Sequence, residues 1–166
     1  MVIIDEVAGD LLNAKEPYIA QQCNCVTVKP HGLSQSIAKK WSYGDAYSGR
    51  SKKSNNTATD PDEPGSVVIA EPPEGCSGPI LLQMMAQWCP SKPGAYNRYY
   101  PTTYVDSKEN RRKWFKDCLQ ALDETLDPDS VVAMPDHIGC GLAGGNWTEY
   151  KKMLSDCSTK IKLYKI

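Results

Sequence analysis

Hydrophobic and polar residues follow two different periods along this chain, one typical of strands and the other of helices. Short apolar or β-branched runs, bounded by glycine, proline or polar residues, predict strands at residues 2–7, 18–26, 66–71, 79–88, 130–135 and 160–166. The Pro/Gly-rich segment PPEGCSG joins the third and fourth runs and predicts a hairpin between them.

Three helices are expected between these strands. Leu33, Ile37 and Trp41 recur every four residues, which predicts a helix that begins just after Gly32. A second helix is predicted to begin at a capping Asp106, with Glu109 in the capping-box position. Its buried stripe would comprise Trp114, Phe115, Cys118, Leu119, Leu122 and Leu126. A third helix is expected over NWTEYKKMLSDC. Strands that alternate with helices predict an α/β fold, here a three-layer α/β/α sandwich with a central mixed β-sheet.

Two polar stretches interrupt this pattern. Residues 42–65 are rich in Ser, Asn, Asp, Gly, Lys and Pro without periodicity, and we expect an exposed loop there. A second loop, residues 89–104, carries four tyrosines that either line the mouth of a cleft or pack on the surface, and packing is favoured: Tyr96, Tyr99, Tyr100 and Tyr104. The length of 166 residues suits a single domain spanning residues 1–166, and we expect a monomer.

Charge and cysteine content narrow the class of protein. With 19 basic and 20 acidic residues the net charge is −1, which argues against binding many nucleic-acid phosphates. The basic side chains on the predicted helices are expected to be solvated: Arg111, Arg112, Lys151 and Lys152. No membrane-spanning or targeting segment is evident, so an intracellular, cytoplasmic protein is expected. The seven cysteines form no metal-ligand spacing, which predicts free thiols, no metal site and no cofactor.

The strongest chemical signal is the strand-turn-helix segment VVAMPDHIGCGLAGGNW. A glycine-rich turn before a helix allows backbone N–H groups to converge on a phosphate, although a purely structural turn is the alternative. Gly139, Gly141 and Gly144 match GxGxxG, but a dinucleotide-binding interpretation requires a further half-domain that the sequence does not show after KIKLYKI. No GxxxxGK[ST] motif is present.

Asn24 is a polar residue in an otherwise apolar strand. A buried amide is costly unless it is hydrogen-bonded, so Asn24 either faces a ligand or holds a loop, and the first is favoured. The strand leads through a Pro-His-Gly turn into the first helix, which suggests a second anion site there.

These segments resemble the ligand-binding stretches of macro domains, in the same order and at similar separations. GDLL, QQCNCVTVKPHGLSQSIAKKW and MPDHIGCGLAGGNW carry the resemblance, which spans nearly the whole chain. It is strongest to the branch that contains the yeast ADP-ribose-1''-phosphate phosphatase and the terminal ADP-ribose glycohydrolase. Stand-alone proteins of this kind occur in phages and large DNA viruses, so the resemblance leaves a viral origin, and with it a host cytoplasmic or nuclear location, open.

The resemblance implies a binding site for ADP-ribose. Asp10 would accept a hydrogen bond from the adenine amino group, with Leu11 beside it, and Asn24 would face the distal ribose. The first phosphate loop would contain Gly32, Leu33 and Ser34. The second loop would wrap the pyrophosphate and the distal ribose, chiefly through backbone donors: Ile138, Gly139, Cys140, Gly141, Leu142 and Ala143.

The departures from the family pattern bear on the chemistry. Glu71 and Ala143 stand where the glycohydrolase has its catalytic lysine and aspartate, and Gln21 replaces the histidine of the yeast phosphatase. His31 is the nearest residue able to activate a water, with an exposed turn histidine as the equal alternative. Asp136 and His137 are weaker candidates.

The leading prediction is a metal-independent hydrolase that converts ADP-ribose 1''-phosphate to ADP-ribose and phosphate, with Asn24 and His31 as catalytic residues. Removal of ADP-ribose from an ADP-ribosylated macromolecule is the nearest enzymatic alternative. A non-catalytic ADP-ribose reader is the competing class. A phosphatase with Cys140 as nucleophile is disfavoured, because no arginine follows in the loop to bind phosphate.

Overall fold

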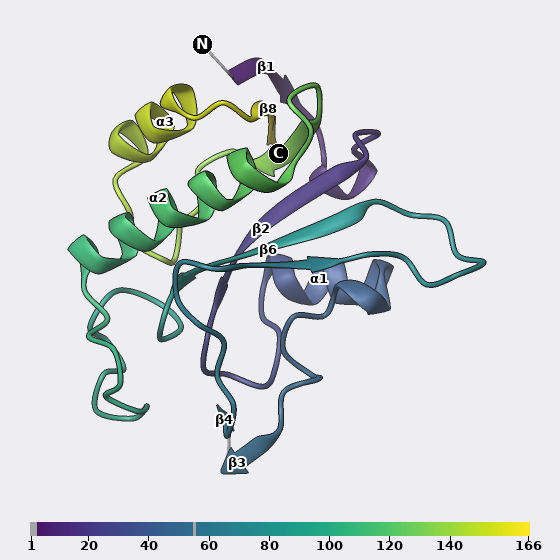
Figure 1. Cartoon of the computed structure of the whole chain (residues 1–166). Coiled ribbons are helices and arrows are strands. Elements are labelled where there is room, and N and C mark those ends of the chain that lie inside the picture. Colours follow the sequence, from purple (N-terminus) through teal and green to yellow (C-terminus); the bar gives the residue numbers. More distant parts are fainter. Residues whose placement is uncertain (1–2, 55) are drawn as a thin grey trace.

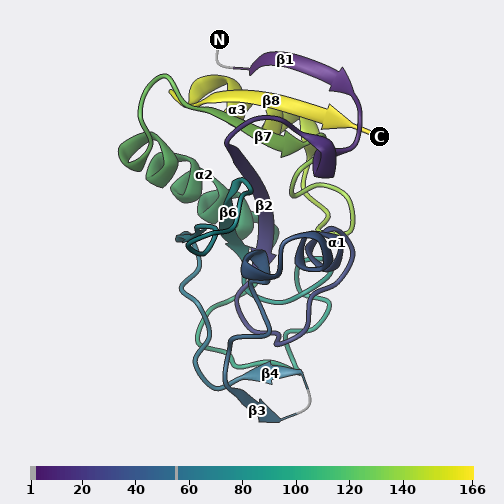
Figure 2. The same ribbon diagram turned by 90° about the vertical axis from the view of Figure 1, so that its right-hand side faces the viewer.

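The computed structural model describes residues 3–54 and 56–166, and its centre is a six-stranded mixed sheet. The strand order is β1-β8-β7-β2-β6-β5, with β5 antiparallel to β6 and all other neighbours parallel. Helix α1 covers one face of the sheet, and α2 and α3 cover the other (Figures 1 and 2). The predicted α/β/α sandwich with a mixed sheet is confirmed.

The observed elements follow the predicted order. The sheet strands are β1 (Ile3–Ala8), β2 (Tyr18–Asn24), β5 (Val67–Ala70), β6 (Ile80–Gln87), β7 (Val131–Pro135) and β8 (Lys160–Lys165). The helices are α1 (Leu33–Lys40), α2 (Lys108–Thr125) and α3 (Trp147–Asp156), with short 3-10 helices η1 (Leu11–Asn13) and η2 (Ser42–Gly44). The antiparallel pairing of β5 with β6 confirms the predicted hairpin. Residue 2 of the first predicted strand lies outside the described residues.

The sheet separates two apolar cores. The larger one lies under α2 and α3, where Phe115 of α2 packs against Tyr150 of α3 with ring centroids 4.5 Å apart. The smaller one lies under α1, where Ile37 packs with Leu11 and Leu81. Strands β2 and β6 lie in the middle of the sheet with a helix layer on either face, which is why they are buried along nearly their whole length rather than at alternate residues.

Helix α2 begins one residue later than predicted. Its N-cap is Ser107, whose hydroxyl accepts a hydrogen bond from the Asn110 N–H at 3.1 Å. Asp106 is buried instead and forms an ion pair with Arg111. The expectation of a solvated Arg111 was therefore wrong, because a buried carboxylate compensates its charge. The side chains of the other three basic residues are accessible to solvent, as expected, and each also forms an ion pair: Arg112 with Glu149, Lys151 with Glu6, and Lys152 with Asp156.

The segment predicted as an exposed loop, residues 42–65, is exposed only in part. It contains η2 and a short hairpin formed by β3 (Lys52–Ser54) and β4 (Thr57–Ala58). Tyr47 and Ala58 are buried, and Arg50 forms an ion pair with Asp62 at 2.7 Å. The polar composition hid these contacts because each anchor is a single residue and produces no periodic pattern.

Among the described residues, no helix combines the length and apolar character needed to cross a membrane.

Candidate functional site

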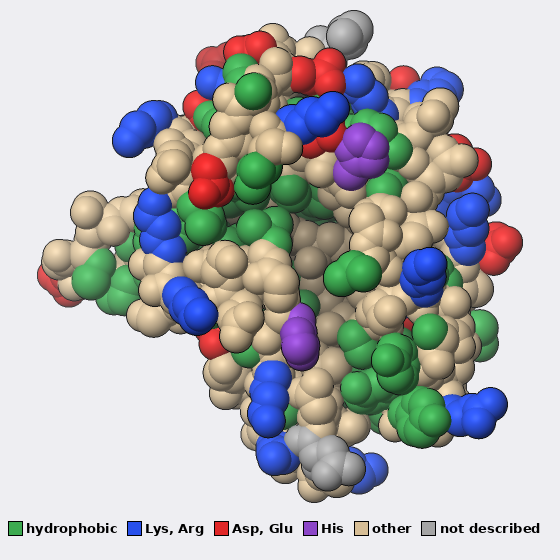
Figure 3. Space-filling view, turned by 180° about the vertical axis from the view of Figure 1, so that it is seen from behind, with side chains coloured by type: hydrophobic (Ala, Val, Ile, Leu, Met, Phe, Trp, Pro, Cys, Tyr) green, Lys and Arg blue, Asp and Glu red, His purple; other side chains and the backbone are tan. Residues whose placement is uncertain are grey.

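A cavity of about 650 Å³ opens where β2 and β7 end. These parallel strands are neighbours in the sheet, and the helices that follow them, α1 and α3, cover opposite faces. Chains that diverge in this way leave a crevice beyond the carboxyl ends of the strands. Figure 3 shows the hollow in the surface, with one of the two histidine side chains on either side of it.

Most of the predicted site residues meet in this cavity. Those that line it are Asn24, His31, Gly32, Leu33, Ser34, Ile138, Gly139, Cys140, Gly141, Leu142 and Ala143, together with Asp136 and His137. Gly32 and Gly141 therefore share one cavity although they follow different strands. Its volume lies within the usual range for small-molecule and cofactor sites.

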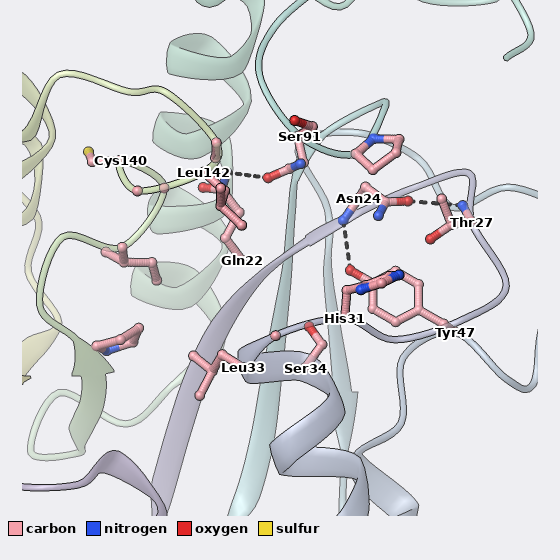
Figure 4. A pocket seen from close by; sticks show the side chains of 18 of the residues that line it. Gln22, Asn24, Thr27, His31, Leu33, Ser34, Tyr47, Ser91, Cys140 and Leu142 are labelled. Atoms are coloured by element: carbon pink, nitrogen blue, oxygen red, sulfur yellow. Dashed lines mark hydrogen bonds between the residues drawn. The ribbon is translucent and has the colours of Figure 1, made fainter. Parts of the chain in front are cut away.

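Asn24 holds a loop and also lines the cavity. Its side-chain Oδ1 accepts hydrogen bonds from the backbone N–H groups of Val26 at 3.1 Å and Thr27 at 2.9 Å, which fixes the chain as it leaves β2 (Figure 4). Its backbone N–H donates to the Tyr47 hydroxyl at 3.0 Å. The side-chain Nδ2 has no hydrogen-bond partner among the described residues. The loop-holding interpretation therefore applies to Oδ1, and a ligand contact through Nδ2 stays a prediction.

The first loop delivers the N-terminus of α1 to the cavity. Gly32 precedes the helix with φ of +56°, a conformation that glycine adopts without strain. No side chain caps this helix, whereas Ser107 and Asn146 cap α2 and α3. In the first turn the Ser34 N–H donates to the His31 carbonyl at 3.1 Å, whereas the N–H groups of Leu33 and Gln35 have no partner among the described residues. These two N–H groups are available to an anion, and the helix dipole favours one there.

The predicted apolar stripe of α1 is only partly buried. Ile37 is fully buried, but Leu33 is 36% exposed and faces the cavity, while Trp41 lies just beyond the end of the helix. Ser34 is buried and donates its hydroxyl proton to Gln21 Oε1 at 2.7 Å. Gln21 thus lies under α1 and does not line the cavity.

Close contacts fix the backbone of the second loop. A Cβ on Gly139, where φ is +75°, would lie 2.6 Å from Gln22 Oε1 and 2.7 Å from a Tyr150 ring carbon. A Cβ on Gly145 would lie 2.5 Å from the Gly139 carbonyl oxygen. Gly141 has open space around it. Glycines at 139 and 145 therefore set the shape of the loop.

Cys140 is poorly suited to act as a nucleophile. Burial of the Cys140 thiol raises its pKa to about 11, so the thiol stays protonated near neutral pH. An arginine does lie near the end of this loop in space, since Arg111 donates to the Ala143 carbonyl. Its guanidinium is buried and already engaged by protein groups, so it is not free to bind a substrate phosphate.

Asp10 and Leu11 do not line the cavity. Leu11 packs in the smaller core with Ile37, and the Asp10 carboxylate caps η1 by accepting from the Leu12 N–H at 2.9 Å. The role of Asp10 in adenine recognition stays a prediction.

Other cavity residues were missed or ranked low from the sequence. Gln22 donates to Gln87 Oε1 at 2.8 Å, and Gln87 donates to the Cys89 carbonyl at 3.0 Å, which forms a polar floor across β2 and β6. Tyr96 and Tyr100 line the cavity, against the expectation of surface packing, while Tyr104 packs against Trp88 and Trp114. The glutamines that interrupt two otherwise apolar strands were the available signal for the polar floor.

A second anchor holds the loop after β2 from behind. Arg50 donates to the carbonyls of Asn24 and Thr27, both at 2.8 Å, and pairs with Asp62. Its guanidinium also lies over the Tyr47 ring, 4.8 Å from the centroid. Burial raises the pKa of the Tyr47 hydroxyl well above its usual value, so this phenol stays neutral.

His137 is the more constrained of the two histidines. Its Nδ1 contacts the Asp136 carboxylate, its ring stacks on Trp147 with centroids 4.9 Å apart, and its φ is +60°. By contrast, the His31 side chain is exposed and has no hydrogen-bond partner among the described residues. Within residues 3–54 and 56–166, no cluster of three or more His, Cys, Asp or Glu side chains is arranged to hold a metal ion.

Solved structures with a similar fold include the macrodomain of Mycobacterium tuberculosis DarG, with 15% identity and a TM-score of 0.65 over 96% of this chain and 95% of that one. The macrodomain of Thermus aquaticus DarG matches with 15% identity and a TM-score of 0.61 over 97% and 95%. The chain has the macrodomain fold.

A Trypanosoma brucei macrodomain, solved in complex with ADP-ribose, matches with 10% identity and a TM-score of 0.54 over 96% of this chain and 62% of that one. No protein-family model matches the chain, and no curated protein sequence does. At these identities the macrodomain neighbours establish the fold, and the function has to be argued from the cavity.

Proposed function

We propose that this protein binds ADP-ribose in the cavity between the first and second loops and hydrolyses a bond at the distal ribose. The observation that carries the proposal is the convergence of three kinds of donor on one cavity: the uncapped N-terminus of α1, the backbone of residues 139–143 and the Asn24 side-chain Nδ2, which has no partner among the described residues. Solved macrodomains from Trypanosoma brucei and Oceanobacillus iheyensis contain ADP-ribose, which supports this choice of ligand.

The charges of the cavity suit a pyrophosphate held by neutral donors. Its charged side chains are few, with Lys29 at the first loop and Asp136 beside the second. Backbone N–H groups therefore have to provide most of the anion binding, as they do in other glycine-loop sites. Tyr96 and Tyr100 offer aromatic surface at the side of the cavity.

The proposed reaction converts ADP-ribose 1''-phosphate and water to ADP-ribose and phosphate. Asn24 would orient the distal ribose through Nδ2, and His31 would take a proton from the attacking water. Backbone N–H groups of the second loop would stabilise the negative charge that develops on the phosphate oxygens. Removal of ADP-ribose from a modified macromolecule would use the same groups.

A second candidate function is an ADP-ribose reader without catalysis. It is favoured by Glu71, which lies outside the cavity, and by Ala143, which brings no functional side chain to it. The enzyme and the reader would share the same binding groups and differ only in turnover.

The test combines calorimetry with two turnover assays. We expect wild-type protein to bind ADP-ribose and to release phosphate from ADP-ribose 1''-phosphate, with release of ADP-ribose from ADP-ribosylated protein as the second assay. The variant His31→Ala should flatten the acidic limb of the pH–rate profile, and His137→Ala serves as the matched histidine control. Tight binding without turnover in either assay would establish the reader, and absence of binding would refute both functions.

A further inference from the structure

Arg111 lies buried beside the cavity, on the first turn of α2, with only 1% of its surface exposed. All five of its N–H donors are used. Nε and Nη2 bind the two Asp106 carboxylate oxygens at 2.6 and 2.7 Å. The remaining donors bind backbone carbonyls of Cys89 at 3.0 Å, Ser91 at 2.6 Å and Ala143 at 3.0 Å.

Because all its donors bind protein groups, Arg111 has a structural role and does not bind a ligand. The forked contact with Asp106 neutralises the charge, and the Asp106 side chain is itself fully buried. Asp106 Oδ2 also accepts from the Cys89 N–H at 2.8 Å. The Asp106–Arg111 ion pair therefore binds both the N–H and the carbonyl of Cys89. No donor remains to point into the cavity.

Two of the three carbonyls belong to separate walls of the cavity. Ser91 lies in the segment that follows β6, and Ala143 lies in the second loop, and both line the cavity. The other backbone hydrogen bonds of residues 139–145 are local, running within the loop or to His137. Among the described residues, Arg111 makes the one side-chain hydrogen bond that joins this loop to another element.

Packing supports the same connection. A Cβ placed on Gly144 would lie 3.3 Å from Pro93 Cδ, so the second loop rests directly on the segment that Arg111 also binds. Without the guanidinium, the Ser91 and Ala143 carbonyls would lose their donor and the buried Asp106 carboxylate would lose its counter-charge. The two walls would then have to move to bring these groups into contact with water.

We propose that Arg111 is a positioning residue that clamps the second loop against residues 89–93 and so presets the backbone donors of the cavity for their ligand. Its effect on ADP-ribose rests on the proposed function, whereas its effect on the loop does not. Donors that folding has already ordered bind a ligand more tightly and catalyse faster than mobile ones, because no further conformational entropy is lost when the ligand binds.

The test is hydrogen–deuterium exchange of the ligand-free protein, paired with calorimetry using ADP-ribose. In Arg111→Lys we expect faster exchange at residues 139–145 and 89–93, with the rest of the sheet unchanged, because an ammonium has three donors and no fork. ADP-ribose should bind about tenfold more weakly or worse, since small displacements of binding groups are costly. Arg111→Met should increase exchange and weaken ADP-ribose binding more than Arg111→Lys does. If Arg111→Met does not fold, the result for Arg111→Lys alone tests the clamp.

The matched control is Leu122→Ala, a buried core position that does not line the cavity and lies about three turns further along α2. It should lower thermal stability without selective exchange at residues 139–145 and without loss of ADP-ribose affinity. If Arg111→Lys and Leu122→Ala give the same exchange pattern, the clamp is refuted and Arg111 only stabilises the fold. If wild-type protein fails to bind ADP-ribose, the proposed function fails, while the exchange data still decide the clamp.

Discussion

At the scale of single residues, the oxygen and the nitrogen of the Asn24 side-chain amide have different roles. Oδ1 accepts two backbone N–H groups from the turn after β2, and Nδ2 is left without a partner among the described residues. The favoured interpretation from the sequence, a ligand-facing amide, concerned only one of these ends. Replacement by alanine would remove both, so alanine cannot separate the structural role from the chemical one.

The variant Asn24→Asp separates them. An aspartate retains an oxygen for the N–H groups of Val26 and Thr27, but it replaces the cavity-facing donor with an anionic acceptor. We expect near-normal thermal stability. Turnover of ADP-ribose 1''-phosphate should fall by more than about tenfold, because the variant loses a hydrogen-bond donor to the ribose and places a negative charge near the phosphate. Asn24→Ala should lose stability as well. Equal turnover in Asn24→Asp and wild type, measured at saturating substrate, would remove Asn24 from the mechanism.

At the scale of elements, the second loop illustrates how glycines at different positions have different functions. Gly139 has a positive φ and close neighbours, whereas Gly141 has neither. The sequence pattern GxGxxG does not distinguish them. Only the contacts with Gln22 and Tyr150, which come from β2 and α3, identify Gly139 as the position where a side chain cannot fit.

The pair Gly139→Ala and Gly141→Ala tests this distinction. Gly139→Ala should destabilise the protein by about 1–3 kcal/mol or more, because it combines a strained φ with a steric clash. Gly141→Ala should leave the free energy of unfolding within about 0.5 kcal/mol of wild type. Urea denaturation monitored by tryptophan fluorescence measures both. Similar losses in the two variants would mean that the loop does not adopt this conformation in solution.

At the scale of the whole molecule, burial controls the ionisation of the thiols. Burial raises the pKa of the Cys23 thiol to about 12, and it also raises the pKa of the Cys25 and Cys118 thiols. In the unfolded chain the same thiols ionise near pH 9, which is the ordinary pKa of a cysteine thiol. Folding therefore requires these groups to stay protonated.

A fall in stability at alkaline pH follows from this difference. Between the unfolded pKa and the raised folded pKa, the native state binds more protons than the unfolded state, so the free energy of unfolding decreases as pH rises. The stabilisation is complete below about pH 8 and should decline by about 1 kcal/mol per buried thiol between pH 9 and 10. Urea denaturation under reducing conditions at several pH values measures the slope.

Two variants provide the controls for this measurement. Cys23→Ala should reduce the fall in the free energy of unfolding by the contribution of one thiol. Replacement of the exposed Cys76 by serine should leave this fall unchanged. A free energy of unfolding that is constant from pH 8 to 10 would contradict the assigned thiol environments.

Much of the fold was predictable because its signals are local and repeated. The period of apolar residues located every sheet strand and all three helices, and the glycine loops marked the ends of β2 and β7 where the cavity forms. The errors concern isolated residues. Asp106 was assigned to a helix cap, Arg111 to solvent and the surroundings of Tyr47 to an exposed loop, since none of the three belongs to a repeating pattern.

The sequence by itself determined the order of elements, the mixed α/β class and the loops that carry the candidate donors, because hydrophobic period and glycine placement act over a few neighbouring residues. Only the tertiary structure decided which polar groups meet. Arg111 and Ala143 are far apart in the chain, as are Asn24 and Tyr47, and their contacts exist because the sheet brings β2, β6 and β7 together. A buried charge or amide is stabilised only by specific partners in space, and composition cannot name them.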